Sequence, residues 1–229
     1  LLLKNSAGNY DLFVKRGDPV TRQRFSLAHE IGHVLLNSVV ELPAQQWSRL
    51  AFAQDPHEDR IEKLCDQMAA EILMPAPVFE NWMGEREWSA FALPEATKGY
   101  SVSLDAASRR FLHLFPGKAA LVRWKLHENG DMQIGYAPVA PKIQNLSCLE
   151  FVTEHHRASS LMLQTYNQMR STRTKETVRM YVGEGISSVR SFVESISHGS
   201  GYWREVYSFV YPGPTSPGQA APDSSLRSE

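Results

Sequence analysis

Residues 24–37 read RFSLAHEIGHVLLN and contain the string His-Glu-Ile-Gly-His at positions 29–33. Apolar residues recur at helical spacing from about residue 21 to residue 37, which predicts an amphipathic helix. On a helix, positions i and i+4 lie one turn apart on the same face, so His29 and His33 can direct both imidazoles at one ion. Glu30 lies beside that face. A zinc hydrolase requires this arrangement, because two neutral histidines hold the metal and a carboxylate takes a proton from water.

The same string also has a structural interpretation, in which a core helix carries two histidines that form ordinary hydrogen bonds. An H-E-x-x-H string arises by chance in roughly 2% of chains with this content of His and Glu. A third protein ligand separates the two interpretations, because catalytic zinc sites use three.

A second amphipathic helix is predicted after residue 57, and Pro75 and Pro77 are expected to end it. Its apolar positions are Ile61, Leu64, Cys65, Met68, Ala69 and Ile72. Glu62 and Asp66 are four residues apart on this helix, so both carboxylates face the same way. We expect Glu62 to be the third ligand and Asp66 to accept a hydrogen bond from the distal nitrogen of a ligating histidine. The alternative is that Glu62 lies on a solvated helix face.

Two stretches resemble signatures of the ImmA/IrrE metallopeptidases. Residues 24–36, RFSLAHEIGHVLL, are similar to R-F-[ST]-L-A-H-E-[IL]-G-H-x-L-L, and residues 62–75, EKLCDQMAAEILMP, are similar to E-x-x-[AC]-[ND]-x-[FM]-A-A-x-[IL]-L-M-P. The resemblance implies a zincin-like fold of the gluzincin type. It implies that His29, His33 and Glu62 bind zinc and that Glu30 is the general base. Manganese is the alternative ion.

The resemblance also implies a biological role. Members of this family are cytoplasmic, site-specific endopeptidases that cut a helix-turn-helix repressor of the XRE type and so release a stress regulon or a mobile element. The expected partner is therefore a repressor protein. A looser similarity extends through residues 101–103 and 109–110, where family members often carry a helix-turn-helix-like segment. Some members have a carboxy-terminal domain likened to a GAF sensor.

The remaining sequence predicts an α+β fold. Short β-rich runs at 1–4 and 10–15 predict a hairpin, and residues 85–115 predict two further helices, the second capped by Ser103. Strands are predicted at 119–126, 132–137, 178–182, 189–196 and 205–211, and a helix at 159–169. We expect four parts: a zinc metallopeptidase domain at 1–84, truncated at its amino terminus, a helix-turn-helix-like segment at 85–117, a sensor-like domain at 118–211 and a disordered tail at 212–229.

Composition narrows the function classes. The 24 basic and 25 acidic residues leave no global charge that would attract nucleic acid or an anionic membrane. The two cysteines are too few for a disulfide framework, which favours a reducing, cytoplasmic compartment. No apolar run approaches the roughly 20 residues that span a bilayer. The chain begins at Leu1 without a methionine, so we expect its natural amino terminus to lie upstream.

A local basic region supports an alternative function. Residues 96–126 contain one acidic residue, Asp105, and six basic residues: Lys98, Arg109, Arg110, Lys118, Arg123 and Lys125. Such a region can face DNA phosphates or an acidic protein surface. The alternative is a DNA-binding transcriptional regulator with a structural metal site, although DNA binding is not expected to be the main function. A third hypothesis is a metal-binding sensor without activity.

Overall fold

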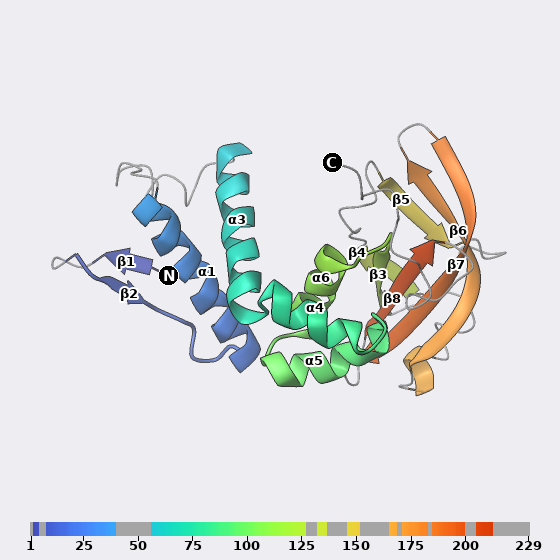
Figure 1. Ribbon diagram of the computed structural model, residues 1–229, viewed down its shortest axis with the longest axis horizontal. Helices are drawn as coiled ribbons and strands as arrows, with labels where there is room; N and C mark the ends of the chain where they lie inside the picture. The colour runs from blue at the N-terminus through green and yellow to red at the C-terminus, as the bar shows by residue number, and fades with distance from the viewer. Residues whose placement is uncertain are drawn as a thin grey trace. The chain divides into compact units, whose positions relative to one another are not determined.

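The computed structural model describes residues 2–4, 8–39, 56–126, 132–136, 146–151, 165–168, 171–182, 185–199 and 205–212 (Figure 1). The chain forms two compact units, one made of residues 1–79 and 96–106 and the other of residues 80–95 and 107–229. Within the described ranges, no helix is long and apolar enough to cross a membrane.

The first unit begins with two antiparallel strands, β1 (Leu2–Lys4) and β2 (Tyr10–Leu12), which confirm the predicted hairpin. Two long helices follow, α1 (Val20–Val39) and α3 (Pro56–Leu73), and Figure 1 shows them side by side. α1 confirms the helix predicted around the His-Glu-x-x-His string. α3 begins slightly earlier than predicted. Its start at a proline has a physical reason, because proline suits the first helical turn, where its missing N–H has no helical partner to lose.

The two long helices pack through small side chains. Ala28 and Gly32 are buried on α1, and Cys65 and Ala69 are fully buried on α3. A Cβ atom at Gly32 would lie 3.2 Å from the Cα atom of Cys65 and 3.4 Å from its carbonyl oxygen. Glycine inside a helix costs about 1 kcal/mol relative to alanine. Here Gly32 permits a close approach of the two helix backbones. The side chains next to Gly32 on α1 therefore lie near the side chains next to Cys65 on α3.

Outside this narrow stripe, α1 is less buried than its apolar spacing suggests. Leu27 is 39% exposed and Leu35 is 45% exposed. The reason is that, in the described part of the chain, α1 packs mainly on α3 and β2, so one stripe of the helix is covered.

The helices after α3 differ in detail from the prediction. Pro75 follows the end of α3 as predicted, but Pro77 lies in the first turn of a further helix, α4 (Ala76–Gly84), which was not predicted. Proline is tolerated in a first turn for the same reason as at the start of α3. A short 3-10 helix, η1 (Ala90–Ala92), and the helices α5 (Leu93–Tyr100) and α6 (Leu104–Leu114) follow. The hydroxyl of Ser103 accepts a hydrogen bond from the amide of Ala106 at 3.1 Å, so the predicted N-cap is confirmed.

The second unit is built on a six-stranded antiparallel sheet in the order β4-β3-β8-β7-β6-β5. Its strands are β3 (Ala120–Leu126), β4 (Met132–Tyr136), β5 (Leu146–Phe151), β6 (Thr172–Val182), β7 (Gly185–His198) and β8 (Glu205–Pro212). β5 was not predicted. β6 is longer than predicted because its first half, TRTKET, lacks apolar alternation. Residues 165–168 of the predicted helix at 159–169 are helical; the rest of that helix and the predicted tail from residue 213 onward lie outside the described residues.

The core of the second unit is aromatic. Phe111 of α6 contacts Phe209 of β8 edge to face, with ring centroids 5.3 Å apart, and Trp88 lies 5.7 Å from Phe111. Both phenylalanines are fully buried. Aromatic pairs at this spacing contribute roughly 0.5–1.5 kcal/mol beyond their buried area. These contacts hold α6 on the sheet.

A buried carboxylate, Glu194 of β7, joins the sheet to the turn before η1. Its side chain is fully buried and accepts hydrogen bonds from the Ala90 amide (2.7 Å), the Ser89 hydroxyl (3.0 Å) and the Tyr211 hydroxyl (3.2 Å). Arg173 of β6 pairs with the same carboxylate through two guanidinium nitrogens. Burial first, and then the charge of Glu194, hold the pKa of Tyr211 well above its usual value.

Candidate metal centre

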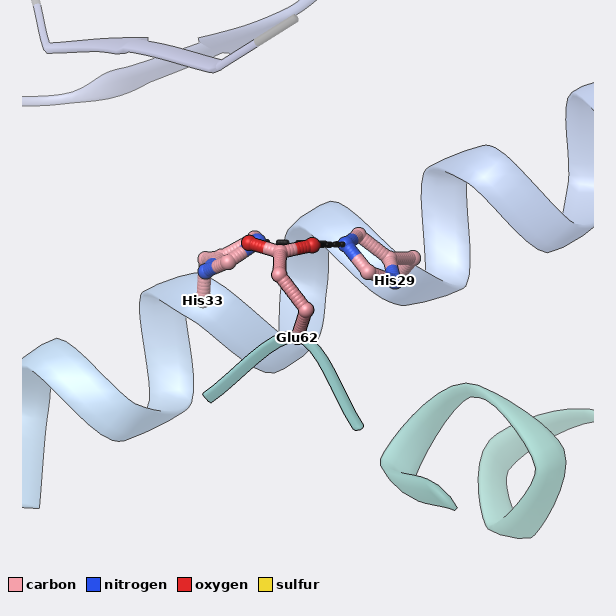
Figure 2. A group of neighbouring side chains, drawn as sticks. All are labelled: His29, His33 and Glu62. Carbon is pink, nitrogen blue, oxygen red and sulfur yellow. Dashed lines mark hydrogen bonds and ion pairs between the residues drawn. The ribbon is translucent and has the colours of Figure 1, made fainter. Parts of the chain in front are cut away.

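Three side chains from α1 and α3 converge on one point in the first unit. Figure 2 shows His29 and His33 on α1 with the carboxylate of Glu62 between their rings. The Nε2 atom of His29 lies 3.0 Å from Oε2 of Glu62, the Nε2 atom of His33 lies 3.3 Å from Oε1, and the two Nε2 atoms are 3.1 Å apart. In the described ranges, no other group of three His, Cys, Asp or Glu side chains is arranged to hold a metal ion. The structure thus brings together the three ligands proposed from the sequence.

The spacing of these atoms fits a tetrahedral ion. Zinc bonds of about 2.0–2.1 Å separate neighbouring tetrahedral ligand atoms by about 3.3–3.4 Å. The 3.1 Å between the two Nε2 atoms is close to that value, as are the 3.0 and 3.3 Å from these atoms to the two different oxygens of Glu62. Two unprotonated imidazole nitrogens at 3.1 Å repel each other unless a proton or a cation lies between them. Two nitrogens and one carboxylate oxygen also match the donor set of catalytic zinc sites, in which a fourth position stays open.

Each histidine has a partner at its other ring nitrogen. Nδ1 of His29 lies 2.9 Å from Oδ1 of Asp66, the position expected from the sequence. Nδ1 of His33 lies 3.3 Å from Sγ of Cys65. A neutral histidine that binds metal through Nε2 carries its proton on Nδ1 and donates it to such a partner. Sequence reasoning missed the Cys65 contact because it counted Cys65 among the apolar positions of the helix.

Burial and charge favour the neutral forms of two groups at the centre. Burial lowers the pKa of His33 below its usual value, although the Glu62 carboxylate opposes this effect. Burial also raises the pKa of the Cys65 thiol to about 12, and the carboxylates of Glu62 and Asp66 add to the rise. The Glu62 and Asp66 side chains are 51% and 58% exposed, so the cluster is open to solvent on their side.

Glu30, proposed as the general base, lies on α1 directly after His29 and is half-buried. Its charge acts on both His33 and Cys65, raising the pKa of each. The carboxylate is therefore close enough to the cluster to influence it electrostatically. This placement suits the predicted role, which requires a carboxylate beside the open position of the ion.

Comparison with known proteins identifies the region that contains this cluster. Residues 2–112 match the family described as the IrrE N-terminal-like domain. These residues belong to the ImmA/IrrE family. The radiation response metalloprotease IrrE of Deinococcus radiodurans is 40% identical over 86 residues, which are 38% of this chain and 26% of that protein. The protein of the same name from Deinococcus deserti is 36% identical over 86 residues, 38% of this chain and 30% of that protein.

The match thus spans less than a third of the length of these two ImmA/IrrE relatives. A solved structure described as a Mycobacterium tuberculosis transcriptional regulator aligns with 87% of this chain and 58% of its own length, at 12% identity and a TM-score of 0.49.

Two arginines of the basic region at 96–126 are paired or buried inside the second unit. Arg123 forms two hydrogen bonds with the Glu205 carboxylate, at 2.6 and 2.7 Å. Arg110 is 5% exposed. Arg110 is therefore largely shielded from solvent, and the charge of Arg123, whose side chain is 26% exposed, is balanced by Glu205. The charge that the region offers to solvent is smaller than its sequence suggests.

Proposed function

We propose that the chain is a cytoplasmic, zinc-dependent endopeptidase whose metal centre consists of His29, His33 and Glu62. The observation that carries the proposal is the triangle of two Nε2 atoms and one carboxylate, with edges of 3.0–3.3 Å, inside an IrrE N-terminal-like domain. Manganese is the alternative ion, because the carboxylate ligand also suits it. The relatives are named metalloproteases, which supports a peptidase activity.

The chain's own residues would divide the chemistry between them. When bound, zinc supplies a Lewis acid that polarises a peptide carbonyl and makes water acidic near neutral pH. Glu30 takes a proton from the attacking water and passes it to the leaving amine. His29, His33 and Glu62 hold the ion, and Asp66 keeps the His29 ring oriented through the 2.9 Å contact with its Nδ1. General base catalysis of this kind contributes about 10²–10⁴-fold.

We further propose that the substrate is a helix-turn-helix repressor of the XRE type, whose cleavage releases stress-response or mobile-element genes. The relatives are named radiation response proteins, which favours a stress role. The half-exposed Glu62 and Asp66 side chains leave the cluster open to a polypeptide.

The decisive experiment compares the wild-type chain with Glu30→Gln and His33→Ala. Each is loaded with zinc, analysed for bound metal and incubated with a helix-turn-helix repressor of the XRE type, the proposed substrate. We expect Glu30→Gln to keep stoichiometric zinc and to lose cleavage by about 10²-fold or more, whereas His33→Ala should lose zinc as well. Normal cleavage by zinc-loaded Glu30→Gln would show that the catalytic role is wrong.

For the rest of the chain we propose a regulatory role, with a sensor-like, GAF-type domain at 118–211 and a helix-turn-helix-like segment at 85–117. The sheet shares its aromatic core with α6 in one compact unit, so the two proposed parts would act together. A small molecule that raises the unfolding temperature of the full chain and changes its cleavage rate would support this role. The alternative, a DNA-binding regulator, predicts salt-sensitive binding to duplex DNA; the burial of Arg110 and the pairing of Arg123 argue against it.

A further inference from the structure

The two ligating histidines have different partners behind their rings. Asp66 and Cys65 are consecutive residues of α3, and each contacts the Nδ1 atom of one histidine. Asp66 offers a charged carboxylate that is 58% exposed. Cys65 offers a thiol that is fully buried. One helix therefore supplies a ligand, Glu62, and a partner for each of the other two ligands.

The position of the sulfur separates it from the ligand set. Sγ of Cys65 lies 3.3 Å from Nδ1 of His33. The other proposed ligand atoms, from His29 and Glu62, lie instead beside Nε2 of the same ring. Nδ1 and Nε2 lie on different edges of the imidazole, and their lone pairs point in divergent directions. The sulfur is thus behind the ring with respect to the ion.

The absence of a side chain at Gly32 allows Cys65 to reach this position. A Cβ atom on Gly32 would meet Cα, Cβ and the carbonyl oxygen of Cys65 at 3.2–3.4 Å. Because Gly32 has no side chain, Cys65 lies against the backbone of α1 directly beside His33. If Cys65 served only in apolar packing, the contact between its Sγ and Nδ1 of His33 would have no function. A metal-binding histidine, however, uses a partner at its other nitrogen to fix its tautomer.

We propose that Cys65 is a positioning residue of the metal centre: its Sγ accepts the Nδ1–H of His33 and so presents Nε2 to the ion. The inference rests on the metal centre proposed above. It makes the centre asymmetric, with a strong anionic partner behind His29 and a weak, uncharged one behind His33, because a thiol sulfur is a poorer acceptor than a carboxylate.

The test uses the full chain and measures zinc affinity by competition with a chromophoric chelator at fixed pH. Loss of an orienting partner typically weakens metal binding by about 10–100-fold. For Cys65→Ala we expect the low end of that range, about 10-fold, because the lost acceptor is weak. Cys65→Ser, which restores an acceptor, should return affinity to within about 3-fold of wild type. Cys148→Ala in β5 removes the chain's other thiol and should leave affinity unchanged.

Two spectroscopic readouts separate positioning from packing. In the zinc-loaded chain, the Nδ1 proton of His33 should exchange with water faster in Cys65→Ala than in wild type, while that of His29 is unaffected. A chain loaded with cobalt should show no thiolate-to-cobalt charge-transfer band that depends on Cys65. Thermal unfolding of the metal-free variants reports any packing defect independently.

The outcomes are decisive in either direction. Unchanged zinc affinity in Cys65→Ala would overturn the proposal, as would equal weakening in Cys65→Ala and Cys65→Ser, since the hydrogen bond would then contribute nothing. A cobalt charge-transfer band lost in Cys65→Ala would make Cys65 a ligand instead. If wild type binds zinc but cleaves no repressor, the proposed activity fails while this inference stands; if wild type binds no metal, both fail.

Discussion

The buried carboxylate of Glu194 offers a direct test of how the second unit is held together. Its two oxygens share the Ser89 hydroxyl but otherwise have different partners. Oε2 accepts from the Ala90 amide at 2.7 Å and from the Tyr211 hydroxyl at 3.2 Å, and Oε1 faces Arg173. In Glu194→Gln, one oxygen becomes an NH₂ group, which must face one of these donors. The Arg173 side chain is 47% exposed and can turn to water, whereas the Ala90 amide is buried and cannot. We therefore expect the glutamine oxygen to remain on Ala90 and the guanidinium to be released.

The magnitude follows from these contacts. Hydrogen bonds to charged groups contribute about 1.5–3 kcal/mol, so Glu194→Gln should lower the free energy of unfolding by about 2 kcal/mol. Glu194→Ala also strands the buried Ala90 amide, which adds about 1–3 kcal/mol, for a total of about 4 kcal/mol. Arg173→Met leaves the carboxylate buried without its cation. Breaking such a pair costs about 3–5 kcal/mol when it is fully buried, and the exposure of Arg173 places the expected value near the lower end.

Urea unfolding followed by tryptophan fluorescence measures these differences, because Trp88 packs on Phe111 and Phe115 in the same unit. The double variant Glu194→Gln/Arg173→Met completes a thermodynamic cycle. We expect it to be less destabilised than the sum of the single variants by about 2 kcal/mol, since the two residues share one interaction. A loss below about 0.5 kcal/mol for Glu194→Gln, or strict additivity in the cycle, would refute the assignment of an ion pair that stabilises this unit.

Three further predictions concern the first unit. Asp66→Asn should weaken zinc binding about 10-fold in chelator competition, because the partner of His29 loses its charge; unchanged affinity would argue against an orienting role. Gly32→Ala should weaken zinc binding and cost up to about 2 kcal/mol of stability, because the cost of overpacking against Cys65 exceeds the gain in helix propensity from alanine. In the control Gly99→Ala, the new methyl group meets nothing within 4 Å, so the change should be neutral or stabilising. At pH 8, native Cys65 should react with iodoacetamide on the order of 1,000-fold more slowly than in the unfolded chain, because its raised pKa leaves little thiolate; mass spectrometry would reveal rapid labelling if this is wrong.

Local periodicity predicted the elements that carry the metal centre but not all of the fold. The helices α1 and α3 were predicted because each carries apolar residues at a regular helical repeat. The β1–β2 hairpin was predicted because turn residues separate its two β-rich runs. β5, an edge strand that pairs with β6, was missed. β6 was predicted too short, because a strand in the interior of a sheet can be completed by pairing on both sides even where its own sequence lacks alternation. The polar run at the start of β6 pairs residue by residue with β7, from Thr172 opposite Ser195 onward.

Contacts between helices were harder to predict than contacts within one. The spacing of His29 and His33 is a property of a single helix and follows from four residues of separation. The contact between Cys65 and His33 depends on the distance between two helices, which no repeat within either one specifies. The burial of Arg110 and the pairing of Arg123 with Glu205 are tertiary in the same sense, so the basic region looked more available in the sequence than it is in the structure.

The proposed metal centre can therefore be viewed as a consequence of helix packing. The His-Glu-x-x-His string places two nitrogens on one face of α1, but a third ligand reaches them only if α3 comes close, and Gly32 permits that approach at 3.2 Å from a hypothetical Cβ to the backbone of Cys65. Gly32 and Cys65 set the spacing of the two helices. Gly32 is next to the proposed ligand His33 on α1, and Cys65 is next to the orienting residue Asp66 on α3. Any substitution that moves α3 by a few tenths of an ångström changes the Glu62 position and the support of both histidine rings together. Because a bound ion draws the same three side chains together, metal binding and the docking of α1 on α3 should stabilise each other.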